Sequence, residues 1–276
     1  MIPTYELGGR AVPAMFYGTA WKEERTAQLT RMALDAGFVA IDTANQRKHY
    51  HEAGVGEALV GRARERLFLQ TKFTYERGQD HRLPYDPAAP LAEQVAQSLR
   101  SSCEHLGVEH IDSLVLHGPE LARGISAGDL EVWRAMERAV HDGSVSLLGA
   151  SNISCSQLEA LLDACEIAPA IVQNRCFARA GWDREVRALC AERGMRYQGF
   201  SLLTANTREL ADERVLAMAR RHGASVAQLV FRFALRLGMI VLTGTTDPQH
   251  MLEDLDCVRF DLDEDEVALL ESIATR

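Results

Sequence analysis

The most constraining feature of this sequence is a repeated alternation of short apolar runs with longer segments of helical spacing. Eight apolar runs, many of them rich in β-branched residues, lie at 13–19, 38–44, 67–73, 113–119, 146–152, 170–176, 196–203 and 240–245. Helix patterns lie between them at 25–38, 91–107, 130–143, 156–166 and 183–194, and several close on a glycine, as helix ends often do. Apolar strands that alternate with helices predict a parallel sheet covered on its faces.

The number of repeats decides the kind of sheet. Eight strand and helix units favour an α/β fold of the closed (β/α)8 TIM barrel type over an open doubly wound sheet. No linker or change in composition divides the chain, so residues 1–276 are expected to form a single domain. The segment 4–16 has a Gly-Gly turn and predicts an N-terminal β-hairpin at the bottom of the barrel. Extra helices are expected near the C-terminus, at 207–223, 225–238 and 263–274.

Composition and charge exclude several classes of function. The chain has 276 residues, 47% of them hydrophobic, and a formal net charge of −9, which argues against a nucleic-acid-binding protein. Its six cysteines form no CxxC pair, so reduced, buried thiols are expected rather than disulfides or a metal site. No apolar segment approaches the length of a membrane span, and no signal sequence is apparent. We therefore expect a cytoplasmic protein, with a monomer as the default.

Polar residues stand where the apolar runs end, and in such barrels the active site forms at those strand ends. The first run ends at Gly18 and Thr19, and the next three at Asp42, Lys72 and His117. A single lysine there is usually solvated, and a single histidine is usually part of the core. An acid, a lysine and a histidine on consecutive strands of one barrel are better explained as a site.

These motifs, in this order, resemble the aldo-keto reductase family over nearly the whole chain. The resemblance rests on GTAW at 18–21, DTA at 42–44, VGEAL at 55–59, TK at 71–72, IDSLVLHGP at 111–119, GASN at 149–152 and VQN at 172–174. Each motif alone is weak, and the ordered set is specific. The resemblance implies an NAD(P)H-dependent carbonyl reductase that converts an aldehyde or ketone to an alcohol by hydride transfer.

The resemblance also implies roles for four catalytic residues. Tyr50 would donate the proton to the nascent alkoxide, and Lys72 would lower the pKa of the Tyr50 phenol. Asp42 would pair with Lys72, because a buried ammonium needs a counter-charge. His117 would donate a hydrogen bond to the carbonyl oxygen and orient the substrate.

The loop before Tyr50 departs from the family pattern. In many members the tyrosine follows the aspartate by about five residues, whereas here Arg47 has that spacing and Tyr50 lies eight residues after Asp42. We expect a longer loop with Tyr50 still in the role of proton donor. The alternative is that Tyr50 is a surface aromatic and that His49 or Lys48 donates the proton. The run at 46–49 could be an ordinary solvated loop or a basic lip for an anionic substrate.

The resemblance further implies a cofactor site, and no metal. Ser151, Asn152 and Gln173 would hold the carboxamide, while the Phe200 ring would lie against the nicotinamide. The full expected set is Gly18, Thr19, Trp21, Ser151, Asn152, Gln173, Phe200, Ser201, Leu203, Gly244, Thr245, Thr246, His250, Glu253 and Asp254.

The choice between NADPH and NADH is open in the sequence. Members that prefer NADPH often carry lysine, serine and arginine after the eighth strand, where this chain has Gly244, Thr245 and His250. A helix that starts near Asp247 could offer its N-terminus to a phosphate, although the Asp247 carboxylate would oppose one. NADPH is expected from the family, with NADH as a rival.

Substrate identity is not encoded in a recognisable way. The aromatic residues Trp21, Tyr75, Phe177 and Trp182 could line the substrate pocket or simply pack in the core, and the short tail after the last helix predicts an open pocket. Two functions other than carbonyl reduction also fit a nicotinamide-binding barrel. One is a regulatory, redox-sensing barrel with little turnover, and the other is a biosynthetic enzyme of modified chemistry, such as dehydration or isomerisation.

Overall fold

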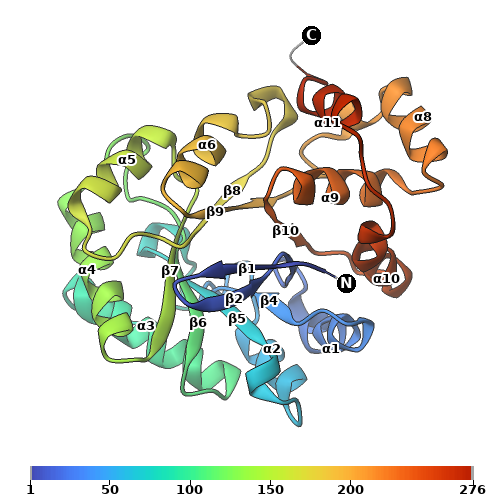
Figure 1. The fold of residues 1–276 in the computed structure, drawn as a ribbon. Coiled ribbons are helices and arrows are strands. Elements are labelled where there is room, and N and C mark those ends of the chain that lie inside the picture. The colour runs from blue at the N-terminus through green and yellow to red at the C-terminus, as the bar shows by residue number, and fades with distance from the viewer. Residues whose placement is uncertain (1, 275–276) are drawn as a thin grey trace.

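The computed structural model describes residues 2–274, and its centre is a closed barrel of eight parallel strands (Figure 1). The strands are β3 (Met15–Gly18), β4 (Ala40–Asp42), β5 (Phe68–Phe73), β6 (Ile111–Leu116), β7 (Val145–Ser151), β8 (Ile171–Arg175), β9 (Arg196–Phe200) and β10 (Ile240–Thr243). They follow one another around the barrel in sequence order, and β10 closes it by pairing with β3, Val241 opposite Met15. The predicted (β/α)8 barrel is confirmed.

Helices surround the barrel on the outside (Figure 1). They are α1 (Thr26–Ala36), α2 (Glu52–Leu59), α3 (Leu91–Leu106), α4 (Ala127–His141), α5 (Cys155–Ala164), α6 (Arg184–Glu192), α7 (Thr207–Leu210), α8 (Glu213–Arg221), α9 (Val226–Arg236), α10 (Pro248–Leu255) and α11 (Glu264–Glu271). Serine side chains begin three of them with capping boxes, at Ser126, Ser154 and Ser225, which satisfy backbone N–H groups of the first turn. The expected helix at 207–223 is in fact two helices, α7 and α8, because Asp212 caps a new start.

The N-terminal hairpin closes one end of the barrel. β1 (Thr4–Leu7) and β2 (Arg10–Pro13) pair in an antiparallel way, joined by a turn in which Gly8 and Gly9 both have positive φ. Leu7 and Val12 pack against Phe16, Phe68 and Ile240 at the N-terminal ends of the strands, in an apolar cluster distinct from the main core. The hairpin therefore covers the bottom of the barrel, as predicted, and leaves the opposite mouth for a site.

Two further expectations concern the cysteines and membrane-spanning helices. All six cysteines are free, three of them buried and three partly buried, so the thiols are less uniformly buried than predicted. Within residues 2–274, no helix is both long and apolar enough to cross a membrane.

Candidate active site

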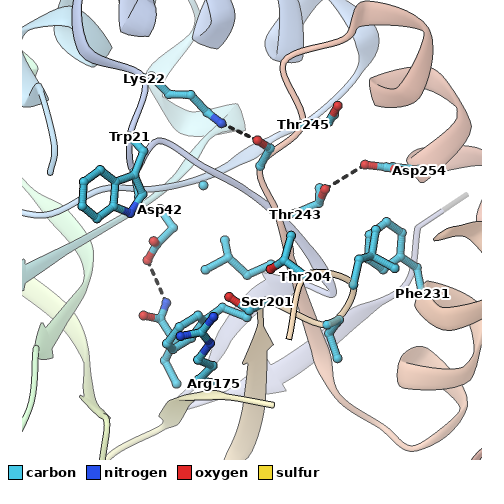
Figure 2. Close-up of a pocket in the computed structure, with 18 of the residues that line it drawn as sticks. Trp21, Lys22, Asp42, Arg175, Ser201, Thr204, Phe231, Thr243, Thr245 and Asp254 are labelled. Carbon is cyan, nitrogen blue, oxygen red and sulfur yellow. Dashed lines mark hydrogen bonds between the residues drawn. The ribbon is translucent and has the colours of Figure 1, made fainter. Parts of the chain in front are cut away.

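A cavity of about 760 Å³ opens at the C-terminal ends of the strands (Figure 2). Of the residues expected from the sequence to form the site, those that line it are Gly18, Trp21, Asp42, Tyr50, His117, Ser151, Asn152, Gln173, Phe200, Ser201, Leu203, Gly244, Thr245, His250, Glu253 and Asp254. Three expected residues, Thr19, Lys72 and Thr246, do not line it. Thr19 is buried and its hydroxyl donates to the Asp42 carbonyl at 3.0 Å, while Thr246 is exposed.

A buried ion pair lies beneath the cavity. The Lys72 ammonium donates to both carboxylate oxygens of Asp42 at 2.7 Å and to the Thr43 carbonyl at 2.8 Å. The side-chain amides of Gln70 and Gln173 also donate to Asp42, at 2.7 and 2.9 Å. Burial lowers the pKa of Lys72, and the Asp42 carboxylate opposes that change. Hydrogen bonds thus hold the charged pair in place, and each of the three protons of the Lys72 ammonium has an acceptor.

Tyr50 lines the cavity beside this pair. The Lys72 nitrogen is 5.1 Å from the centre of the Tyr50 ring, and the phenol hydroxyl makes no hydrogen bond within residues 2–274. The side chain is half-buried, and this burial together with the Asp42 charge raises the pKa of Tyr50. This direction is opposite to the one expected from the sequence, because burial of the phenol and the nearby Asp42 charge both favour its neutral form. The phenol therefore keeps its proton at neutral pH.

His117 lies beside Tyr50 at the barrel mouth. The two rings are 6.0 Å apart between centroids in an edge-to-face arrangement. The Nδ1 atom of His117 is 2.7 Å from the Thr74 hydroxyl. Burial and the neighbouring Lys72 charge lower the pKa of His117 to about 3, so the imidazole is neutral at physiological pH. It can donate or accept a hydrogen bond without acting as a cation.

The loop before Tyr50 holds His49 and Lys48, the two alternative proton donors that the sequence left open. His49 lines the cavity and stacks on Trp21 with a ring separation of 3.7 Å, whereas Arg47 and Lys48 do not line it. Burial lowers the pKa of His49. His49 therefore remains a possible proton donor by position, while Lys48 does not. A basic lip formed by residues 46–49 is not supported, since its two permanent cations, Arg47 and Lys48, do not line the cavity.

Amide groups gather beside the ion pair. Asn152, which has φ of 51°, donates to the His117 carbonyl at 2.8 Å and to the Ser151 hydroxyl at 3.2 Å. Gln173 donates its amide protons to Asp42 and to Gln198, both at 2.9 Å. The side-chain oxygens of Asn152 and Gln173 make no hydrogen bond within residues 2–274. Both amides are thus oriented, each with an acceptor to spare for a ligand.

The outer end of the cavity combines hydroxyl, acidic and basic groups. Thr243 donates to Asp254 at 2.8 Å, and burial raises the pKa of Asp254 to about 6. The Lys22 ammonium donates to the Gly244 carbonyl (Figure 2). The N-terminus of α10 is already capped, because the Asp247 carboxylate accepts from two of its backbone N–H groups. The expectation that this helix end receives a phosphate is therefore not supported.

Several residues near the cavity were not identified from the sequence. Among them are Lys22, Arg175, Ser225 and Phe231, which line the cavity, and Thr74, which contacts His117. Arg175 follows Gln173 by two positions on β8, so strand alternation could have placed its side chain on the same face. Nothing in the sequence indicates that Lys22 reaches Gly244, because their loops meet only when the barrel closes.

A second cavity of about 530 Å³ adjoins the first. The two share Gln46, His117 and Asn152, and Thr74, Tyr75 and Arg77 line the second one. Of the four aromatic residues considered for a substrate pocket, Trp21 lines the first cavity and Tyr75 the second. The other two lie elsewhere. Trp182 is fully buried, with its indole N–H donating to the Leu270 carbonyl at 2.8 Å, and Phe177 packs beneath Arg175 and Arg179.

Comparison with known proteins identifies the class. The model of the aldo/keto reductase family matches residues 6–275. An aldo-keto reductase of Mycobacterium sp. (strain JLS) is 29% identical over 268 residues, which are 96% of this chain and 90% of that protein. Glyoxal reductase of Bacillus subtilis (strain 168) is 27% identical over 244 residues, covering 88% and 81%. A mutant of Gox0644 solved in complex with NADPH superimposes with a TM-score of 0.84 at 25% identity, covering 99% and 94%.

The chain therefore belongs to the aldo/keto reductase family, a family of NAD(P)-dependent oxidoreductases that act on small carbonyl compounds. The similarity extends over nearly the full length of both partners in these comparisons.

Proposed function

We propose that this protein reduces an aldehyde or ketone to an alcohol with NADPH, and that Tyr50 donates the proton. The observation that carries the proposal is the placement of Tyr50 and His117 at one end of the cavity, with the Lys72 and Asp42 pair directly behind the phenol. The kinship with glyoxal reductase favours small, reactive carbonyl compounds as substrates.

The cavity suits a nicotinamide dinucleotide in size and in chemistry. Its volume lies within the range of small-molecule and cofactor sites. Asn152 and Gln173 offer amide oxygens to a carboxamide, and Phe200 offers a ring for stacking. When bound, the cofactor supplies the hydride for the carbonyl carbon.

NADPH is the proposed cofactor because Gox0644, a similar protein, was solved with it. Lys22 supports this choice, since its ammonium provides a positive charge beside Gly244, where many relatives that use NADPH have a lysine. Glu253 and Asp254 at the same end of the cavity favour NADH, because carboxylates repel a phosphate and accept bonds from a ribose hydroxyl. NADH remains the alternative cofactor.

The residues divide the proton chemistry between them. Tyr50 holds a proton at neutral pH and transfers it to the carbonyl oxygen as charge develops there. The phenolate that results lies near the Lys72 ammonium, which stabilises it. The neutral His117 orients the carbonyl oxygen by a hydrogen bond.

The test is a comparison of the wild type with Tyr50→Phe. NADPH and NADH absorbance is followed with glyoxal and a panel of aldehydes, ketones and quinones. Loss of the general acid should lower kcat by about 10²- to 10⁴-fold, with unchanged cofactor affinity. Turnover that survives in Tyr50→Phe and disappears in His49→Gln would reassign the acid to His49. Tight cofactor binding by the wild type, without turnover of any compound, would favour a sensing barrel instead.

A further inference from the structure

Thr74 is the neighbour of His117 that the mechanism above does not use. Its hydroxyl is 2.7 Å from Nδ1 of His117, and no other hydrogen bond of that hydroxyl exists within residues 2–274. Thr74 is itself buried, with 6% of its surface exposed. The two groups are therefore each other's partner on this side of the ring.

The position of the Thr74 hydroxyl is fixed by its surroundings. The Thr74 carbonyl accepts from the Tyr85 hydroxyl at 2.7 Å and from the Gln79 amide at 3.4 Å, which holds the backbone. The Thr74 methyl lies so close to Gly78 that a Cβ on that glycine would be 2.7 Å from it. With the methyl packed beside Gly78, the hydroxyl is directed at His117.

The contact allows two arrangements of protons. A neutral imidazole carries one proton, either on Nδ1 or on Nε2. If Nδ1 holds it, Nδ1 donates to the Thr74 oxygen, and Nε2 can only accept. If the Thr74 hydroxyl donates to Nδ1, the proton is on Nε2, which makes no hydrogen bond within residues 2–274. Only the second arrangement gives His117 a proton to donate to a carbonyl oxygen.

We infer that Thr74 is a positioning residue for His117: its hydroxyl donates to Nδ1, so that Nε2 carries the proton and faces the carbonyl oxygen of the substrate. The inference rests on the proposed reductase function. Other groups act on this ring without selecting a nitrogen. Lys72 and His49 both disfavour a cationic imidazole, and Tyr50 contacts the ring only edge to face.

The experiment uses three variants of the full-length chain. Thr74→Val keeps the shape of the side chain and removes the hydroxyl, whereas Thr74→Ser keeps the hydroxyl and removes the methyl. Thr30→Val is the matched control, because the buried Thr30 hydroxyl on α1 has no hydrogen-bond partner in the structure. With NADPH and glyoxal, Thr74→Val should lower kcat by about 10- to 100-fold, the effect of leaving a buried nitrogen unpaired. Thr74→Ser should recover most of the rate, and Thr30→Val should match the wild type.

A second measurement does not depend on turnover. Nitrogen-15 NMR of histidine-labelled protein distinguishes a protonated from an unprotonated ring nitrogen, and the His117 signals are those absent from His117→Gln. The wild type, with and without NADP⁺, should show protonated Nε2 and hydrogen-bonded, unprotonated Nδ1. Thr74→Val should lose that signature while its affinity for NADPH, measured by fluorescence, stays within about 2-fold. Protonated Nδ1 in the wild type, or an unchanged kcat in Thr74→Val, would overturn the inference. A wild type without turnover but with protonated Nε2 would count against the reductase function only.

Discussion

Replacing Asp42 by asparagine removes the counter-charge of an ammonium that has no access to solvent. The Lys72 side chain is 0% exposed, and Asp42 supplies two of its three hydrogen bonds. In Asp42→Asn the lysine either stays charged without a partner or gives up its proton. Deprotonating a lysine of ordinary pKa at pH 7 costs about 1.4 kcal/mol for each of roughly 3.4 pH units, or about 4.6 kcal/mol. That figure is an upper bound on the electrostatic part of the lost stability. It agrees with the roughly 3–5 kcal/mol of stability that is lost when one partner of a buried ion pair is removed.

The pH dependence of this loss has a definite sign. Burial already lowers the pKa of Lys72 in the folded protein, and the loss of Asp42 lowers that pKa further. The unfolded chain then binds a proton that the folded variant does not, so the stability of Asp42→Asn rises with pH towards the ordinary lysine pKa. At pH 9.5 the electrostatic part of the loss falls to about 1.2 kcal/mol. We therefore expect the gap to the wild type to narrow on going from pH 7 to pH 9.5.

Thermal unfolding followed by circular dichroism measures the effect. At pH 7 the Tm of Asp42→Asn should lie roughly 6–10 °C below that of the wild type. The matched control is the double variant Asp42→Asn with Lys72→Met, in which no buried charge remains and much of the stability should return. The reasoning is refuted if Asp42→Asn unfolds within about 2 °C of the wild type. It is equally refuted if the double variant is no more stable than the single one.

Two further predictions concern stability away from the ion pair. Burial raises the pKa of Asp254 to about 6, so the folded protein loses stability as the pH rises from about 4 to 6. The variant Asp254→Asn should therefore be more stable than the wild type by about 1–3 kcal/mol at pH 8. At pH 4 the two proteins should be equally stable. Denaturant titrations at the two values check this, and a difference that is the same at both would contradict it. Gly56→Ala places a Cβ 2.0 Å from the His105 carbonyl, so α2 and α3 must separate. We expect the free energy of unfolding to fall by about 1–3 kcal/mol, in place of the usual gain from alanine in a helix. Urea denaturation measures this change. If Gly56→Ala is as stable as the wild type, α2 and α3 can separate at no cost and the prediction is wrong.

Much of the candidate site could be read from strand ends. Asp42, Lys72 and His117 end consecutive apolar runs, and parallel strands in a barrel bring their C-terminal ends to one rim. Gln173 could be placed at the same rim, because it lies near the end of the apolar run at 170–176. The loop residues were harder, because the spacing after Asp42 departs from the family pattern. Tyr50 was the expected proton donor, with His49 or Lys48 as the alternative, and the cavity lining sets aside only Lys48.

The sequence by itself determined the barrel, the hairpin at its base and the identity of the polar residues at its mouth. The reason is that periodicity and strand ends are local properties, which a chain carries in its order of residues. The tertiary structure alone decided that Lys72 lies behind the cavity wall, and that burial and the Asp42 charge raise the pKa of Tyr50. It also decided that Thr74 meets His117 and that Lys22 reaches the Gly244 carbonyl. These contacts join side chains from separate strands and loops, and their distances and burial are set only when the barrel closes.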